Sequence, residues 1–295
     1  MRLKHIEVFN AVMLTGSVSG AAKILHVTQP AVTQALRHAE LQLGYMLFTR
    51  QRNGLVPTRE GLALYPEVQQ LMVMLESVRR AAAALKSSAD TPLRILVVPS
   101  LAVRALPDAL RIFRVRHPKT PVTIRTLHSA EIARAMALRE ADVGIVYGSP
   151  PNSALHEEHI ATGRLVCVSA TTGSAVDREP IEFEKVFAKP FIRIDESDPL
   201  GAMLADQWAR LGAAPAAGIT VQTYHVALVL AEEGFGTAII DSFTANSSRN
   251  PNLTTRTLLP ELPVTLRALL PGGVRSPRPV SDFTEAFAKV TNALR

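Results

Sequence analysis

Cysteine is almost absent from this chain of 295 residues, in which Cys167 is the single example. One cysteine forms neither a disulfide framework nor a cysteine metal cage, so small disulfide-rich folds and thiolate zinc sites are excluded. Between two valines, Cys167 is expected to be a small buried apolar residue. This sparse use of cysteine is typical of a protein in a reducing compartment.

Long apolar runs are also missing, because no stretch has the roughly 20 consecutive apolar residues that a transmembrane helix requires. Residues 1–10 alternate charged and apolar side chains and lack the apolar centre of a secretory signal, so we expect a cytoplasmic protein. With 47% apolar and 20% charged residues, the chain can bury substantial cores. Its length predicts two or three domains.

Proline is rare in the first 90 residues, which contain Pro30, Pro57 and Pro66, whereas the other 17 prolines follow. This distribution predicts a helical front and a mixed remainder. The first 90 residues have 10 Lys and Arg against 6 Asp and Glu, while the remainder has 22 against 20. A basic front third suits a polyanion such as DNA, although many solvated surfaces are equally basic.

The first 60 residues divide into three short amphipathic helices. The apolar face of the first is expected to comprise Leu3, Ile6, Phe9 and Met13. Ser17 is expected to cap the second helix, and after a three-residue turn Thr28 caps the third, with Pro30 in its first turn. Two helices joined by a tight turn are the arrangement of a helix-turn-helix that reads DNA.

The third helix, residues 29–43, has an apolar side and a polar side. The residues expected to be buried are Val32, Leu36 and Leu43. Gln29, Thr33 and Gln34 are expected to be exposed, where glutamine can pair with adenine and threonine can touch a thymine methyl group. Three arginines are better placed for phosphate contacts: Arg37, Arg50 and Arg52. The competing interpretation is an ordinary solvated surface helix.

A hairpin and a long helix are predicted next. Asn53-Gly54 indicates a tight hairpin turn, and its basic flanks can lie against the sugar-phosphate backbone as a wing. Thr58 then caps a helix with a heptad seam. The seam residues are Leu64, Val68, Leu71, Leu75, Val78, Ala82 and Leu85. The seam predicts pairing with a second subunit, with packing onto its own domain as the alternative, and it keeps its register across Pro66.

Beyond a small, polar, proline-containing hinge at residues 86–92, apolar runs alternate with helical segments. The expected strands are residues 93–98, 122–126, 143–147, 165–168, 191–194, 219–222, 237–240 and 264–270. The expected helices are residues 101–116, 130–139, 199–211, 224–233 and 281–294. This alternation predicts α/β architecture with a parallel sheet, in which ligands bind at the carboxyl ends of strands.

Other chemistry has little support in the sequence. His156-Glu157-Glu158-His159 lacks the HExxH order of a zinc protease and is expected to lie in a solvated connection. Gly234-Phe235-Gly236 precedes a strand, which predicts a turn rather than a dinucleotide loop. Neither a G-x-S-x-G elbow nor a Walker sequence occurs. We therefore expect no enzyme, no cofactor and no metal site.

The front of the chain closely resembles the LysR-type transcriptional regulators. The matching residues are Leu3-Lys4-His5-Ile6-Glu7-Val8-Phe9, Gly16-Ser17, Ala21-Ala22, Leu25-His26-Val27-Thr28-Gln29-Pro30-Ala31-Val32-Thr33, Glu40, Leu43-Gly44, Leu47-Phe48, Arg50 and Pro57-Thr58. The family usually has Ser at Thr33, a basic residue at Gln34 and a large aliphatic residue at Ala39, so the base preference is expected to differ. Residues 11–16 and 223–240 are most similar to the regulators of lysine biosynthesis and of opine or arginine catabolism.

The resemblance implies an α-helical winged helix-turn-helix at residues 1–58, a dimerising linker helix and hinge at 59–90, and an effector domain at 91–295. The effector domain would be shaped like a periplasmic binding protein. Its subdomain I would comprise residues 91–161 and 268–295, and its subdomain II residues 162–267. Family members form homodimers, usually assembled into homotetramers, that act at promoters when a small coinducer binds.

Effector-binding residues are expected after the strands of this rear domain. Ser100 and Ser129 each follow a strand and precede a helix, and the family's effector pockets use these two positions. Such residues can hold a carboxylate, or can simply cap their helices. Further expected wall residues are Tyr147, Ser197 and Thr223. If the effector is an amino acid, an acidic residue within 195–198 is expected to hold its ammonium group.

The sequence therefore predicts a LysR-type DNA-binding transcriptional regulator that responds to an amino acid or a related carboxylate. Its expected DNA contacts are Ser17, Thr28, Gln29, Pro30, Thr33, Gln34, Arg37, Arg50 and Arg52. A solute-binding protein with no DNA role is the alternative, because the rear two-thirds has that architecture.

Overall fold

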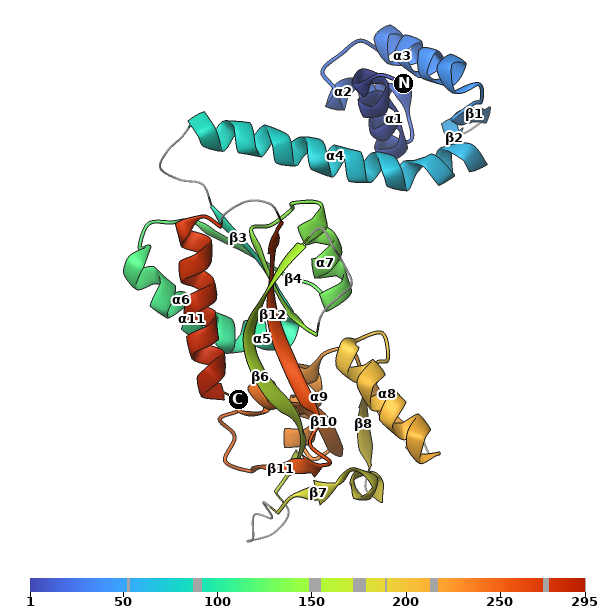
Figure 1. The fold of residues 1–295 in the computed structure, drawn as a ribbon. Coiled ribbons are helices and arrows are strands. Elements are labelled where there is room, and N and C mark those ends of the chain that lie inside the picture. The colour runs from blue at the N-terminus through green and yellow to red at the C-terminus, as the bar shows by residue number, and fades with distance from the viewer. Residues whose placement is uncertain are drawn as a thin grey trace. The chain divides into compact units, whose positions relative to one another are not determined.

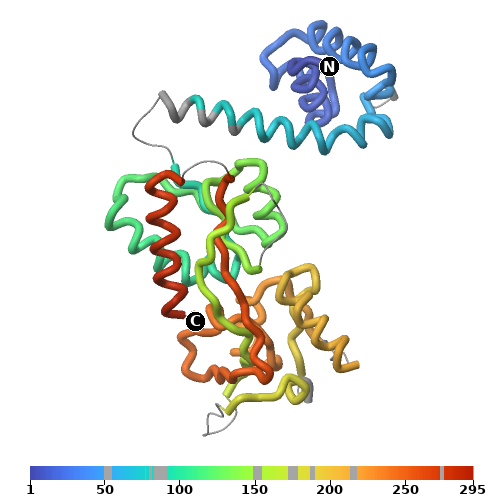
Figure 2. Tube along the Cα trace, in the orientation of Figure 1, coloured from blue at the N-terminus to red at the C-terminus, as the bar shows by residue number. Residues whose placement is uncertain are grey.

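The computed structural model describes residues 1–51, 54–86, 92–148, 155–171, 179–188, 190–212, 217–272 and 276–294. Internal contacts divide the chain into two compact units, Met1–Lys86 and Ser87–Arg295. Figure 1 labels the helices and strands of each unit, and Figure 2 traces the same chain as a tube. Among the described residues, no helix combines the length and the apolar character that crossing a membrane requires.

The front unit consists of three helices, a hairpin and a long helix. Its elements are α1 (Leu3–Thr15), α2 (Val18–Ile24), α3 (Gln29–Leu43), β1 (Phe48–Gln51), β2 (Gly54–Pro57) and α4 (Arg59–Lys86). Gly16 and Gly44 end α1 and α3 in the left-handed conformation, with φ of 65° and 80°, which glycine adopts without a Cβ clash. The predicted winged helix-turn-helix is confirmed.

The core of the front unit differs from the prediction in α1. The buried apolar residues of this helix are Val8, Phe9, Ala11 and Val12. Of the predicted face, Phe9 is buried and Ile6 and Met13 are half-buried against the same core, whereas Leu3 is 45% exposed, so the prediction is wrong at Leu3 and misses Val8 and Val12. Two apolar stripes overlap on α1, and the contacts with α2 and α3 select the stripe that contains Val8 and Val12.

The rear unit alternates strands and helices. Its helices are α5 (Pro99–Val103), α6 (Ala105–Arg116), α7 (Ser129–Ala137), α8 (Pro199–Leu211), α9 (Tyr224–Glu232), α10 (Ser242–Ala245) and α11 (Arg278–Leu294), with a 3-10 helix η1 at Phe183–Ala188. Its strands are β3 (Leu93–Val97), β4 (Val122–Thr126), β5 (Val143–Tyr147), β6 (Leu155–Ala170), β7 (Ile181–Glu182), β8 (Phe191–Ile194), β9 (Ala217–Val221), β10 (Thr237–Asp241), β11 (Leu253–Leu259) and β12 (Pro263–Pro271).

These strands form one mixed sheet in the order β4-β3-β5-β12-β6-β10-β8-β9, with β11 paired to β6 and β7. β3 is parallel to β4 and β5, and β8 is parallel to β9 and β10. We call β3–β5 with α5–α7 and α11 lobe I, and β8–β10 with α8–α10 lobe II. The long antiparallel strands β6 and β12 run through both lobes (Figure 1). The α/β fold class is confirmed, but the sheet is mixed.

Lobe I has helices on both faces of its strands, with α6 beside α11 on one side and α7 on the other (Figure 1). Phe113 of α6 and Phe283 of α11 meet edge to face, with ring centroids 6.2 Å apart, and both side chains are buried. Because helices cover both faces of these strands, the polar side chains gather at the carboxyl ends of the strands.

Strand β6 is the main departure from the predicted secondary structure. It begins at Leu155, whereas the predicted strand begins at Leu165, and it pairs with β12 from Leu155 to Arg164. The segment His156-Glu157-Glu158-His159 therefore lies in a strand, and the predicted solvated connection is wrong. β11 is absent from the prediction as well. Charged side chains interrupt the apolar pattern by which strands are predicted in these segments. The strands form because the tertiary fold supplies their partner strands.

Candidate DNA interface and polar junction

The turn between α2 and α3 sets the direction of the third helix. Ser17 Oγ accepts a hydrogen bond of 3.0 Å from the Gly20 N–H, which confirms the predicted cap of α2. His26 has φ of 54°, so the chain turns sharply before Thr28. Thr28 occupies the N-cap position of α3 with an extended backbone, but its side chain makes no capping hydrogen bond.

One side of α3 is apolar and buried, and the other is polar and exposed. The buried residues are Val32, Ala35, Leu36 and Ala39. The predicted DNA contacts that lie exposed at the front of this helix are Thr28, Gln29, Pro30, Thr33, Gln34 and Arg37. Thr33 Oγ1 donates to the Gln29 carbonyl at 3.1 Å, so the methyl group and the free lone pairs of Thr33 remain available. The helix thus presents amide, methyl and guanidinium groups on one side.

The base of the hairpin is fixed to α3 and α4 by side chains. Glu40 Oε1 accepts the N–H groups of Leu47 at 2.8 Å and Phe48 at 3.3 Å. Thr58 Oγ1 donates to the Met46 carbonyl at 2.8 Å and accepts the Gly61 N–H at 3.0 Å, which confirms its predicted cap of α4. These bonds hold the hairpin and the exposed side of α3 as one rigid surface.

The hairpin pairs Phe48 with Pro57 and Gln51 with Gly54, so the predicted hairpin is confirmed. Gly54 belongs to β2 rather than to the turn, and Asn53 lies outside the described residues. Arg52 lies outside the described residues, as does the side chain of Arg50, although its backbone belongs to β1. A hollow of about 680 Å³ lies in the same unit. It is lined by Val18, Thr33, Leu36, Arg37, Glu40, Leu41, Gly44, Tyr45, Met46, Phe48 and Leu55, and so by residues of both α3 and the hairpin.

Helix α4 divides its apolar residues between the front unit and solvent. It is continuous through Pro66, as the heptad seam predicts. Val68 is buried, and Leu64, Tyr65 and Met72 pack against the same core. Leu71, Met74 and Val78 are 40%, 48% and 62% exposed. The first seam residues, Leu64 and Val68, therefore pack onto their own unit, whereas the later seam residues Leu71 and Val78 form an outward apolar stripe together with Met74.

In the rear unit, polar side chains gather where strands of the two lobes end. Ser100 and Ser129 start helices after β3 and β4, and Tyr147 ends β5. In lobe II, Asp198, Tyr224 and Asp241 follow or end β8, β9 and β10. We call these six residues the polar junction. All six are at least nine-tenths buried.

Tyr147 connects the two lobes at this junction. Its hydroxyl lies 3.3 Å from Ser100 Oγ, and its ring meets that of Tyr224 edge to face, with centroids 5.2 Å apart. Burial raises the pKa of Tyr147 well above its ordinary value, and the neighbouring Asp241 carboxyl adds to the effect. Tyr147 is therefore a neutral hydroxyl that faces an acidic group of the other lobe.

Two carboxyl groups of lobe II are buried at the junction. Asp198 Oδ1 accepts the Leu200 N–H at 3.0 Å, and Asp241 Oδ1 accepts the Thr244 N–H at 2.8 Å. Burial raises the pKa of Asp198 to about 6, with His128 of lobe I opposing and Asp241 reinforcing the rise. Burial also raises the pKa of Asp241. Charge on either group is thus disfavoured unless a cation comes close.

The remaining predicted effector residues lie differently. Thr223 is half-buried at the N-cap of α9 and makes no side-chain cap. Ser197 is exposed, and its hydroxyl donates to Asp195 within the same turn. Tyr224 and Asp241 are not among the residues predicted from the sequence to contact the effector. The signal for Asp241 is its place after an apolar strand and before a helix, which is also the place of Ser100.

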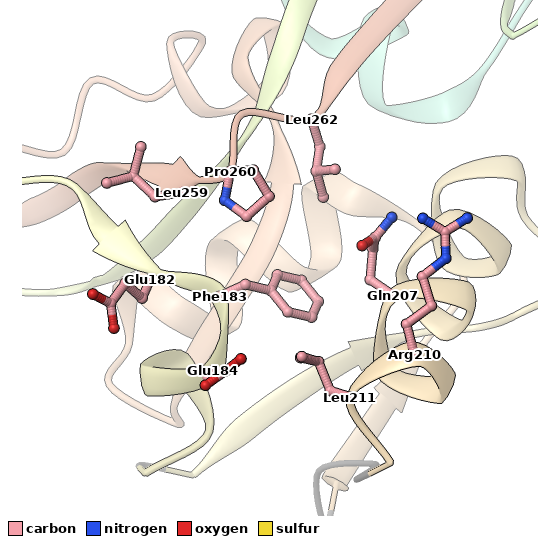
Figure 3. A pocket seen from close by; sticks show the side chains of 9 residues that line it. All are labelled: Glu182, Phe183, Glu184, Gln207, Arg210, Leu211, Leu259, Pro260 and Leu262. Carbon is pink, nitrogen blue, oxygen red and sulfur yellow. The ribbon is translucent and has the colours of Figure 1, made fainter.

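A separate pocket of about 270 Å³ lies in lobe II (Figure 3). Its lining residues come from β7 and η1, from α8 and from the segment around Pro260: Glu182, Phe183, Glu184, Gln207, Arg210, Leu211, Leu259, Pro260 and Leu262. None of the predicted effector residues lines it. Within the described ranges, no group of three or more His, Cys, Asp or Glu side chains is arranged to hold a metal ion.

Family models match almost the whole chain. Residues 3–62 match the model described as "Bacterial regulatory helix-turn-helix protein, lysR family", and residues 86–292 match the "LysR substrate binding domain". Among curated proteins, the HTH-type transcriptional regulator DgcR of Pseudoalteromonas sp is 32% identical over 91% of this chain and 92% of its own length. The regulatory protein NocR of Agrobacterium fabrum is 28% identical over 99% and 97%.

Solved structures agree with this assignment at the level of the fold. Full-length CbnR in complex with its target DNA has a TM-score of 0.68 and 19% identity, covering 98% of this chain and 100% of that one. Full-length OxyR of Pseudomonas aeruginosa has a TM-score of 0.65 and 17% identity, covering 97% and 94%. The alternative of a solute-binding protein leaves the helix-turn-helix unexplained. This chain belongs to the LysR family of DNA-binding transcriptional regulators, with an effector-binding domain behind its helix-turn-helix.

Proposed function

We propose that α3 enters the major groove of promoter DNA and reads bases with Gln29, Thr33 and Gln34. Arg37 would contact phosphates, and the remaining expected backbone contacts are Ser17, Thr28, Pro30, Arg50 and Arg52. The observation that carries the proposal is the exposed polar side of α3, whose opposite side is fixed in the core by Val32 and Leu36. A helix held in this way can place short polar side chains against base edges.

Footprinting on the DNA upstream of the protein's own gene tests whether α3 recognises a specific DNA sequence. We expect one site to be protected from cleavage, and we expect this protection to persist when random competitor DNA is added. Gln29→Ala is expected to weaken discrimination at one base pair by about 1–3 kcal/mol. Lys119→Ala, which changes an exposed residue of the rear unit, is the matched control and should leave the footprint unchanged. Equal binding to promoter and random DNA would refute the proposal.

We also propose that residues 59–90 join two subunits through the outward stripe of α4, with residues 1–58 as the DNA reader and 91–295 as the sensor. Subdomain I of the sensor would comprise 91–161 and 268–295, and subdomain II 162–267. Exposed Leu71, Met74 and Val78 support the pairing, since an apolar stripe of this kind gains stability when a second helix covers it. Two such dimers would form the tetramer.

The sensor is proposed to bind a small carboxylate at the polar junction. Ser129 Oγ is buried without a hydrogen-bond partner in the described structure, at the first turn of α7, where N–H groups favour an anion. Ser100, Tyr147, Ser197 and Thr223 are the other proposed contacts. The protein would act as a cytoplasmic switch and not as an enzyme. The proposed contacts can bind and orient a ligand, but they do not include a nucleophile activated by a neighbouring general base.

Calorimetric titration of the full chain with small carboxylates tests the sensor. Ser129→Ala is expected to weaken binding at least tenfold, whereas Ser281→Ala, an exposed serine of lobe I, should not change it. Unchanged affinity in Ser129→Ala would place the effector elsewhere.

A further inference from the structure

The two sides of the polar junction differ in the charge that they favour. On lobe I, the buried polar side chains of the junction carry hydroxyl groups, including those of Ser100 and Ser129, and the N-cap residue of α7 is His128. The acid in the first turn of α7, Glu131, is exposed and accepts the His128 N–H at 3.1 Å. On lobe II, the N-cap residues of α8 and α10 are Asp198 and Asp241, whose carboxyl groups satisfy those helix ends internally. Lobe I therefore favours an anion, and lobe II favours a cation.

Asp241 is the more deeply buried acid of the pair. Its exposure is 0%, compared with 6% for Asp198. One carboxyl oxygen accepts the Thr244 N–H, and the other makes no hydrogen bond of normal geometry with any described residue, although Tyr147 and Thr244 lie close enough to influence its pKa. A buried carboxyl oxygen left in this state is unfavourable in a folded protein unless something else binds it.

Other buried atoms at the same place are also unsatisfied. Tyr224 Oη and Thr244 Oγ1 of lobe II and Ser129 Oγ of lobe I find no hydrogen-bond partner within the described part of the chain. Tyr147 lies against both Tyr224 and Ser100, and His128, which directly precedes Ser129, lies close enough to Asp198 for their charges to interact. Groups from both lobes therefore converge on one junction. Native interiors leave few such atoms, and their concentration here indicates a ligand with several polar groups.

We propose that Asp241 selects an effector that carries a cationic amine as well as a carboxylate. The inference rests on the proposed function, in which the polar junction is the effector site. The carboxylate lies at Ser100 and Ser129, and the amine nitrogen lies at Asp241, with the Tyr147 and Thr244 hydroxyls beside it. The effector is thus a zwitterionic amino acid or an amine derivative of one. Asp241, rather than the exposed turn at residues 195–197, supplies the decisive negative charge.

This arrangement predicts strong discrimination against acids without an amine. A 2-hydroxy acid would place its carboxylate equally well, but it would leave the buried carboxyl of Asp241 without a cation. Sites built around a buried polar group reject ligands that lack the matching group by large factors. We expect at least about a 100-fold preference for the amino acid over its 2-hydroxy analogue.

The test compares the full chain with two variants of equal charge change. Asp241→Asn keeps an oxygen for the Thr244 N–H and removes only the negative charge. Asp206→Asn alters an exposed residue of α8 and serves as the control. Each protein is titrated calorimetrically with the standard amino acids and with their 2-hydroxy analogues. Binding of promoter DNA and the far-UV circular dichroism spectrum show that each variant is folded.

The expected result is that the wild type and Asp206→Asn bind an amino acid selectively, whereas Asp241→Asn binds the amino acid and its hydroxy analogue within about threefold of each other. Selective binding that persists in Asp241→Asn overturns the inference, and so does a wild type that prefers amine-free acids. In both cases, loss of binding in Ser129→Ala would leave the proposed carboxylate site standing. If no carboxylate of either kind binds, both proposals fail.

Discussion

The Glu40 carboxylate of α3 accepts the backbone N–H of Leu47 at 2.8 Å, and through this bond it attaches the hairpin to the helix that carries the exposed polar residues. The second bond, from Phe48, uses the same oxygen. Glu40 is half-buried, so when its carboxylate is removed, water cannot fully take its place as the acceptor for the two N–H groups. A side chain that lies away from the proposed base contacts thus holds the whole surface in place.

Replacing Glu40 by Ala is expected to destabilise the front unit by about 1–3 kcal/mol, because two N–H groups lose their acceptor. Hydrogen exchange should be faster at the Leu47 and Phe48 amides, and binding to promoter DNA should weaken. Glu67→Ala, which removes an exposed carboxylate from α4, is the control and should change neither property. Unchanged exchange at Leu47 would mean that this bond is unimportant in solution.

Arg37 is expected to contribute a phosphate contact rather than base discrimination. In Arg37→Ala, affinity should fall by a similar factor for promoter and random DNA. The slope of log affinity against log salt concentration should become less negative by about 1, because one fewer counterion is released. Fluorescence anisotropy over a series of salt concentrations measures both quantities. A selective loss of promoter binding with an unaltered slope would instead assign Arg37 to base reading.

Val78 tests the outward stripe of α4. A charge in the middle of a helix pairing seam has to be buried, so Val78→Glu should raise the dimer dissociation constant more than tenfold, which is at least about 1.4 kcal/mol. Sedimentation equilibrium measures the change. Gln69→Glu adds the same charge on the opposite side of α4 and should leave the dimer intact. A monomeric wild type, or a fully dimeric Val78→Glu, would contradict the proposed pairing.

Asp198 should make the rear unit less stable as the pH rises. Its folded pKa of about 6 lies above the ordinary value of 3.8, so the folded protein binds the proton more tightly than the unfolded chain does. The free energy of unfolding therefore falls as the pH rises from about 4 to 6, and it stays lower above that range, by up to about 3 kcal/mol from this group.

Asp198→Asn removes this dependence while keeping an acceptor for the Leu200 N–H. Relative to the wild type, the variant should therefore gain stability between pH 4.5 and pH 7.5. Urea unfolding followed by the fluorescence of Trp208, the single tryptophan, reports on the rear unit that contains both residues. A difference between variant and wild type that stays constant with pH would show that Asp198 is not perturbed in solution.

The front unit could be predicted almost completely because its signals are local. Ser17, Gly44 and Thr58 determine helix ends through caps and backbone conformation, and these effects act within a few residues. The buried stripe of α1 could not be predicted. Two stripes fit the helical period, and the packing of α2 and α3 decides between them.

In the rear unit too, features that depend on neighbouring residues could be predicted, and features that depend on distant contacts could not. Ser100 and Ser129 are recognisable because each lies between a strand and a helix that the sequence predicts. Asp241 has the same place in the chain, but on its own it has the sequence signature of an ordinary N-cap. Only the approach of Tyr147 from the other lobe distinguishes it, and that contact joins strands far apart in the sequence. The first half of β6 escaped prediction for a similar reason, since β12 supplies its partner.

Strands β6 and β12 are shared by both lobes, and this has a consequence for cooperativity. Neither lobe can melt alone without breaking the backbone ladder that continues into its neighbour. The sensor should therefore lose its structure in a single transition, and a compound that stabilises one lobe raises the melting temperature of both.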